Sequence, residues 1–193
     1  MFKNLYAWTI ALAESRHAPL ALALVSFAES SFFPIPPDVM LIPMVVAQPK
    51  RAWFFAGVCT VASVIGGMVG YLIGWALYDT LGLWLINLYG AGAKMESLRE
   101  AYEKWGALLI LIKGVTPIPY KFVTIVSGFL GYNFLLFVLL SAITRGARFF
   151  IVAGLLNRFG EPIKAWLADN FGLFIALLVV ALIGGIFVAT RLL

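Results

Sequence analysis

Two copies of Pro-Ile-Pro, at 34–36 and 117–119, interrupt long apolar stretches of this chain and restrict its fold more than any other feature. Proline has no N–H to donate, and its ring clashes with the preceding turn, so neither stretch can continue as one regular helix. Inside a membrane, interrupted backbone is stable only where protein or a water-filled cavity covers it. Paired interruptions in corresponding places are typical of a transporter site at the membrane midplane. The prolines expected to break the helices are Pro34, Pro36, Pro37, Pro117 and Pro119.

The composition places these stretches in a membrane. The chain of 193 residues is 63% hydrophobic and 12% charged, whereas about 25% of residues are charged in a typical soluble domain. The length suits a single membrane domain covering residues 1–193. The net charge of +5 is modest and its positive residues are scattered. We therefore expect anionic or phosphate-bearing membrane lipids as partners, and no nucleic acid.

The first repeat is predicted at 18–78. Its return limb at 39–47 covers only about 14 Å, roughly half of a hydrocarbon core that is about 30 Å thick. The limb is therefore expected to return to the surface from which it came, as a re-entrant hairpin. Residues 52–78 carry no charged side chain and are long enough to cross the membrane.

A ridge of small residues recurs at every fourth position of this crossing helix: Ala62, Gly66, Gly70 and Gly74. Small side chains at this spacing let another backbone approach closely. Packing within the fold is the favoured interpretation, and a homo-oligomer contact is the alternative.

The same pattern returns in a second repeat at 106–156, after an interfacial amphipathic linker at 79–105. The two motifs are offset by 83 residues (117 minus 34). One membrane crossing separates the hairpins, so they should enter from opposite faces and meet near the midplane. A transmembrane helix at 171–190 follows, while residues 1–17 either span the membrane or lie at its interface. The predicted fold is an all-α polytopic membrane protein, an inverted repeat of re-entrant hairpin plus transmembrane helix with a C-terminal transmembrane helix.

Arg145 and Arg148 lie near the centre of the predicted crossing helix at 134–156. Each central arginine costs about 2.5–3.5 kcal/mol on insertion, which the surrounding apolar residues barely offset. The two arginines share one helical face with Ser141, which must therefore point to a polar interior. They form either an anion site for a phosphate or a structural clamp on the hairpin carbonyls or on nearby carboxylates.

Four further charges accompany the two proline breaks: Glu29, Asp38, Lys113 and Lys121. Glu29 and Asp38 can exchange protons, or they can be structural, with Asp38 stabilising the first turn of its own return helix. The two lysines can contact a ligand or pair with these carboxylates. Because Asp38 and Lys121 occupy equivalent positions in the two repeats, we expect them to form an ion pair at the midplane.

The sequence carries no pattern of an enzyme site. The single histidine, His17, is far in sequence from either proline break, and no zinc, serine-hydrolase or phosphate-loop motif is present. We therefore expect no catalytic residues, no metal ligands and no cofactor.

Three segments together resemble the DedA family, whose members carry the SNARE-associated (VTT) domain, and in particular its small YqaA-like branch. They are the segments at 29–38 (ESSFFPIPPD), 65–71 (IGGMVGY) and 113–121 (KGVTPIPYK). The resemblance covers roughly residues 20–160. It implies two re-entrant hairpins, a multi-pass location in a bacterial inner (cytoplasmic) membrane, lipid handling and dependence on proton motive force.

The resemblance also implies roles for single residues. The acidic pair of the family corresponds to Glu29 and Asp38, which are closer together here than in its better-studied branch. Its basic pair is typically arginine, but Lys113 and Lys121 stand at those positions in this chain. Lysine lacks the bidentate fork of arginine, which a nearby arginine could supply instead.

The function expected from these observations is transport of a phosphate-bearing lipid, undecaprenyl phosphate or a phospholipid, with possible proton coupling, by a translocase or scramblase mechanism. A proton-coupled exporter of small cations and a non-transporting membrane assembly factor are the alternatives.

Overall fold

The computed structural model describes residues 15–31, 36–84, 88, 92–115, 120–160, 162 and 180. Within these residues all regular secondary structure is helical and no strand occurs, which confirms the all-α prediction for this part of the chain. Two helical stretches are long and apolar enough to cross a membrane, Pro49–Thr80 and Phe134–Gly160. Three predicted features lie outside the described residues: the segment at 1–14, the prolines Pro34, Pro117 and Pro119, and nearly all of the helix predicted at 171–190.

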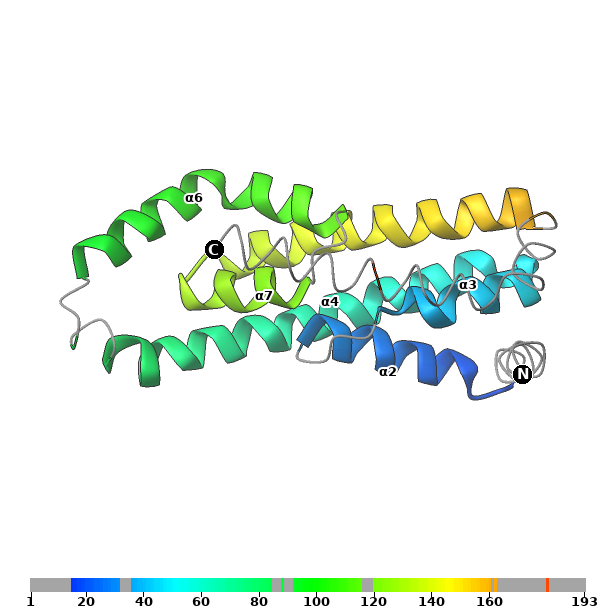
Figure 1. The fold of residues 1–193 in the computed structure, drawn as a ribbon, viewed down its shortest axis with the longest axis horizontal. Coiled ribbons are helices and arrows are strands. Elements are labelled where there is room, and N and C mark those ends of the chain that lie inside the picture. The colour runs from blue at the N-terminus through cyan, green and yellow to red at the C-terminus, as the bar shows by residue number, and fades with distance from the viewer. Residues whose placement is uncertain are drawn as a thin grey trace.

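The first proline break separates two short helices that run in opposite directions, α2 (Ala18–Ser31) and α3 (Asp38–Ala47) (Figure 1). Pro37 precedes α3 with a helical φ of −65°, and its carbonyl accepts a helical hydrogen bond from Leu41 N at 2.8 Å. The fixed φ of proline suits a helix start, where no N–H is needed. Asp38 follows in the first turn, where a carboxylate opposes the positive end of the helix dipole.

A turn of 3₁₀-helix, Pro49–Arg51, leads into the long helix α4 (Ala52–Leu77), which matches the crossing helix predicted at 52–78. A π-helical turn at Tyr78–Gly82 ends it. This single helix runs the length of the molecule in Figure 1, past both hairpins.

The second hairpin consists of α6 (Gly92–Val115) and α7 (Tyr120–Phe129). The two segments predicted on either side of residues 105 and 106, an interfacial helix and an inward limb, form one continuous helix, because α6 runs through that point. Gly106 does not end the helix. A Cβ there would lie 2.9 Å from the rings of Tyr102 and Tyr132, so the glycine allows close packing while costing a helix only about 1 kcal/mol.

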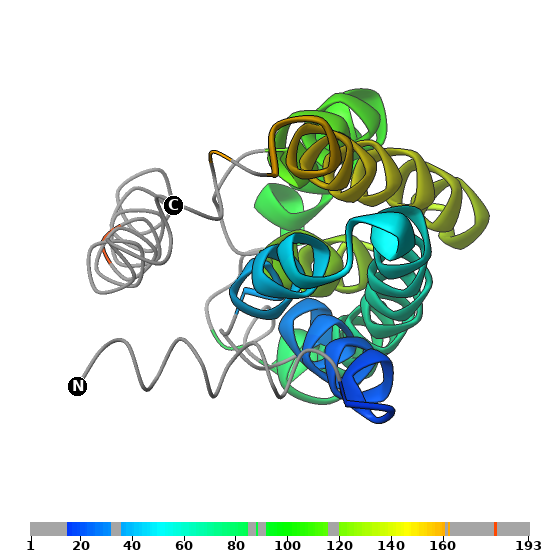
Figure 2. The same ribbon diagram turned by 90° about the vertical axis from the view of Figure 1, so that its right-hand side faces the viewer.

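The two hairpins occupy opposite ends of the molecule. In Figure 1, α2 and α6 run toward the middle from opposite sides, and α3 and α7 run back toward the ends where their hairpins began. After α7, Gly131 adopts a left-handed φ of +70°, and the chain returns along the molecule as the helix Phe134–Gly160. This helix ends beyond the predicted limit of 156. Seen along the bundle, α2, α3, α4 and Phe134–Gly160 surround a common interior (Figure 2).

The small-residue ridge on α4 is the contact surface for both hairpins. A Cβ on Gly66 would overlap the Phe27 carbonyl of α2, and one on Gly74 would overlap the Ile125 carbonyl of α7. On the other side, a Cβ on Gly128 of α7 would overlap the Tyr71 carbonyl. The backbones therefore touch directly, which confirms that this ridge packs within the fold.

The packing on either side of this contact differs in chemistry. The half of the molecule around α3 has an aliphatic core that includes Leu22, Leu41 and Val45. The half around α7 has a core rich in aromatic residues, including Tyr71, Tyr120 and Phe137. The polar residues described next lie between these two cores.

Candidate functional site

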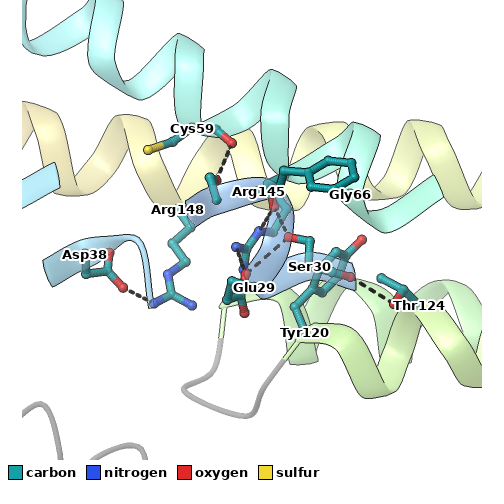
Figure 3. Close-up of polar contacts among 12 residues, drawn as sticks. Glu29, Ser30, Asp38, Cys59, Gly66, Tyr120, Thr124, Arg145 and Arg148 are labelled. Carbon is teal, nitrogen blue, oxygen red and sulfur yellow. Dashed lines mark hydrogen bonds and ion pairs between the residues drawn. The ribbon is translucent and has the colours of Figure 1, made fainter. Parts of the chain in front are cut away.

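Two arginines and two carboxylates meet where the hairpins approach each other (Figure 3). Glu29 comes from the last turn of α2 and Asp38 from the first turn of α3. Arg145 and Arg148 lie one helical turn apart on Phe134–Gly160. The proline break brings both carboxylates to one place because the two hairpin helices end and begin there.

Arg145 is almost completely buried, with 1% of its side chain exposed. Its Nη2 donates to Glu29 Oε2 at 2.6 Å, and its Nε donates to Ser63 Oγ of α4 at 2.6 Å. The guanidinium also lies against two rings, with its Cζ 4.8 Å from the ring centroids of both Tyr120 and Phe149. Ionic, hydrogen-bond and cation–π contacts together hold this charge in an apolar interior.

Hydroxyl groups complete the surroundings of this buried pair. Ser30 Oγ lies 2.6 Å from Ser63 Oγ and donates to Glu29 Oε2 at 3.2 Å. The carbonyl of Ser30 accepts from Thr124 Oγ1 of α7 at 3.2 Å, which links the two hairpins directly. A further hydroxyl pair, Tyr120 with Ser141, lies beside the guanidinium. The network therefore joins α2, α4, α7 and Phe134–Gly160.

The second pair is less enclosed. Arg148 Nη2 donates to Asp38 Oδ2 at 2.6 Å, with the Arg148 side chain 23% exposed. The other carboxylate oxygen, Asp38 Oδ1, is buried without a hydrogen-bond partner in the described structure. A buried carboxylate oxygen that lacks a donor is costly, so this pair is the incompletely satisfied part of the cluster.

The two ion pairs agree with one of the two interpretations of the arginines, a clamp on Glu29 and Asp38. The expected pairing of Asp38 with Lys121 is wrong, because Asp38 pairs with Arg148. Although Lys121 does lie near the start of α7, as Asp38 does for α3, its ammonium lies 5.7 Å from the ring centroid of the adjacent Phe122. Equivalent positions in two repeats need not pair, and within the described residues the Asp38 carboxylate forms its ion pair with Arg148.

The remaining predicted residues are only partly described. Lys113 belongs to α6, but its side chain lies outside the described part, as do Pro34, Pro117 and Pro119. Pro36 and Pro37 are described and precede α3. Within the described ranges no group of three or more His, Cys, Asp or Glu side chains is placed to hold a metal ion.

Sequence reasoning did not identify four residues of the network: Ser30, Ser63, Tyr120 and Thr124. Ser63 is the one polar position of its turn in α4 and is completely buried. A buried hydroxyl in an apolar helix must find a partner, and this requirement was the available signal. The partner itself, Arg145, lies 82 positions away in the chain and could not be deduced.

Comparison with known proteins shows two relatives that match most of the chain. An uncharacterized protein of Haemophilus influenzae is 40% identical over 173 residues, covering 88% of both chains. An uncharacterized protein of Histophilus somni is 38% identical over 170 residues, again covering 88% of each. A third, from Methanocaldococcus jannaschii, is 28% identical over 107 residues, 54% of this chain and 62% of its own length. No family model matches the chain, and no solved structure matches it. The chain belongs to the family of the Haemophilus influenzae and Histophilus somni proteins.

Proposed function

We propose that this protein is a multi-pass membrane protein of the DedA type that moves a phosphate-bearing lipid, coupled to a proton, across a bacterial inner membrane. The observation that carries the proposal is the Asp38–Arg148 ion pair, which is partly exposed and incompletely hydrogen-bonded at the meeting point of two hairpins. Phosphate and carboxylate are both suited to the guanidinium fork, so they can compete for Arg148.

The distribution of apolar side chains supports the membrane location. On Phe134–Gly160, Leu135, Ile143 and Ile151 are more than half exposed, while Arg145 of the same helix is buried. α4 likewise exposes Trp53, Val61 and Leu72. A helix that turns its charged residues inward and its large apolar residues outward is suited to a lipid environment. The opposed hairpins are suited to re-entrant segments from the two membrane faces.

The two arginines have different parts in the proposed mechanism. Arg145 is held by Glu29, Ser63 and two aromatic rings, so it cannot turn toward a ligand without breaking the interior. Arg148 has one carboxylate contact and a partly exposed side chain. Arg148 is therefore the group that binds the phosphate, while Arg145 maintains the fold around it.

Charge balance at Asp38 couples lipid binding to proton binding. When a phosphate oxygen takes the place of Asp38 on Arg148, Asp38 loses its cation in an interior of low polarity. A buried carboxylate without a partner is strongly disfavoured as an anion, so Asp38 binds a proton as the phosphate arrives. Release of the lipid on the other side restores the Asp38–Arg148 pair, and Asp38 releases its proton on that same side. One negative charge and one proton thus occupy the site together.

The resemblance to DedA proteins agrees with this assignment of roles. Its acidic positions fall on Glu29 and Asp38, which the structure pairs with different arginines. Its basic positions fall on Lys113 and Lys121, and we propose that these lysines attract the phosphate before Arg148 engages it. Lysine suits this step because it acts as a point charge rather than as a bidentate fork.

The test is reconstitution into liposomes with a fluorescent undecaprenyl phosphate or phospholipid analogue, with reduction of the outer-leaflet dye as the measure of movement. Arg148→Gln should slow movement at least tenfold, since a hydrogen bond to a charged group contributes about 1.5–3 kcal/mol. Asp38→Asn should retain movement but lose its response to an imposed pH gradient. Arg158→Gln, an exposed arginine on the same helix, is the matched control.

Three outcomes would contradict the proposal. Undiminished movement in Arg148→Gln would remove the phosphate site. Accumulation of a small cation driven by the pH gradient, without lipid movement, would indicate a cation exporter. Inertness toward both lipid and cation in well-inserted protein would indicate an assembly factor.

A further inference from the structure

A polar cavity lies at the end of the molecule that holds the α6–α7 hairpin, far along the chain from Glu29 and Asp38. Its volume is about 350 Å³, within the range of small-ligand sites. It lies between the first half of α6 and the turn after α7, and neither wall contributes a residue to the two ion pairs. Its lining residues are Glu96, Arg99, Glu100, Tyr102, Glu103, Leu130, Gly131, Tyr132, Asn133 and Leu136.

Arg99 forms no ion pair within the described structure, although three carboxylates line the same cavity. Glu96 and Glu103 are three and four residues away on the same helix, a spacing at which opposite charges pair. Instead, the guanidinium lies over the ring of Tyr78, with its Cζ 4.4 Å from the ring centroid. Its buried Nε lacks a hydrogen-bond partner among the described residues.

The position of the guanidinium keeps it at the cavity wall. A Cβ at Gly131, which also lines the cavity, would lie 4.0 Å from Arg99 Nη2. Gly131 adopts a left-handed φ of +70°, so its turn can approach the guanidinium without a side chain between them. The N–H groups that Tyr78 does not cover are therefore available to an anionic oxygen.

The carboxylates of the cavity require a positively charged group in the ligand, whereas Arg99 requires a negatively charged one. Glu96, Glu100 and Glu103 recur at i, i+4 and i+7 and so share one face of α6. With Arg99 among them, the wall carries three negative charges and one positive charge. A simple anion would be repelled by the glutamates, and a simple cation would leave the Arg99 guanidinium without a partner.

We infer that this cavity binds a zwitterion that carries a phosphate ester and a primary ammonium group, as in phosphoethanolamine. The phosphate lies on Arg99, and the ammonium lies among Glu96, Glu100 and Glu103. Such a group occurs free or as the headgroup of an aminophospholipid. The lipid form depends on the proposed membrane location, which places the polar half of α6 at the membrane surface, and Leu130 and Leu136 of the lining then meet the glycerol end.

Calorimetric titration of the full chain in detergent tests the inference with phosphoethanolamine, inorganic phosphate and ethanolamine as separate probes. Phosphoethanolamine should bind most tightly. Arg99→Gln should weaken phosphoethanolamine about tenfold and leave ethanolamine unchanged, because it removes the phosphate contact alone. Glu103→Gln should weaken ethanolamine and phosphoethanolamine but strengthen inorganic phosphate. Lys104→Gln, the next residue on α6 and not part of the cavity lining, is the control and should change none of the three.

Nanodiscs separate the two sources of the ligand. Slower exchange of phosphatidylethanolamine than of phosphatidylglycerol, abolished by Arg99→Gln, indicates the lipid headgroup. Binding of free phosphoethanolamine without this lipid preference indicates the soluble compound. The inference would be overturned if phosphate and phosphoethanolamine bound equally well. It would also be overturned if Lys104→Gln lost as much affinity for phosphoethanolamine as Arg99→Gln. Arg148→Gln should retain this binding even if it moves no lipid, so failure of the translocase proposal can be recognised separately.

Discussion

Two ion pairs of almost identical geometry lie side by side in this protein, yet their surroundings are different. Glu29–Arg145 and Asp38–Arg148 each have an N–O distance of 2.6 Å, and each joins the first hairpin to the helix Phe134–Gly160. The first is enclosed by hydroxyls and aromatic rings, and 1% of its arginine is exposed. The second leaves one carboxylate oxygen without a donor and 23% of its arginine exposed.

The difference shows how one helix can carry two arginines with different freedom to change partners. A charge that is buried with several contacts cannot move without leaving its partner uncompensated, so Arg145 is suited to holding the hairpins together. A charge with one contact and partial exposure can change partners at a lower cost. One helical turn therefore separates a structural arginine from the arginine proposed to bind substrate.

The largest loss of thermal stability should come from breaking the enclosed Glu29–Arg145 pair. Arg145→Gln leaves the Glu29 carboxylate buried without its cation, which typically costs about 3–5 kcal/mol. We expect a large fall in the thermal unfolding midpoint in detergent, and recovery of much of it in Glu29→Gln/Arg145→Gln. Arg158→Gln provides the baseline for losing an exposed arginine. If Arg145→Gln were as stable as this baseline, the enclosed pair would have no structural role.

A smaller effect should follow from disturbing the backbone contact beside the enclosed pair. A Cβ at Gly70 would lie 3.1 Å from the Ser30 carbonyl and overlap the Thr124 side chain, so Gly70→Ala should cost about 1–3 kcal/mol through overpacking. Gly57 lies on the same helix with nothing within 4 Å of such a Cβ. Gly57→Ala should therefore be neutral or stabilising by about 0.5–1 kcal/mol. Thermal unfolding of the two variants compares them directly, and equal losses would contradict the packing argument.

The smallest effect on stability should come from the partly exposed pair, where a double-mutant cycle measures the coupling. Asp38→Asn with Arg148→Gln should give a coupling energy of about 0.5–1 kcal/mol, at the low end for residues in contact. The cycle of Asp38→Asn with Lys121→Met should give none, because Asp38 pairs with Arg148. Coupling to Lys121 that equals the coupling to Arg148 would restore the pairing expected from the repeat.

The positions of the helices could be predicted from local sequence patterns. The limits predicted for α3 and α4 agree with the structure to within about one residue, because proline positions and an apolar run of defined length act on the backbone locally. The burial of Arg145 was also predictable, since a central arginine on an apolar helix must face the protein interior. The continuity of α6 through Gly106 could not be predicted. The glycine at this position is explained by packing against Tyr132, which comes from a distant turn.

The sequence by itself determined that two proline-broken helical pairs and two long apolar helices would form, and that their charges would turn inward. Only the tertiary structure decided which charges meet. Glu29 and Arg145 are 116 positions apart, and Asp38 and Arg148 are 110 apart. The internal repeat instead suggested Asp38 with Lys121. Periodicity determines the face of a helix on which a side chain lies, whereas pairing depends on the crossing of helices, which here is governed by direct backbone contact along α4.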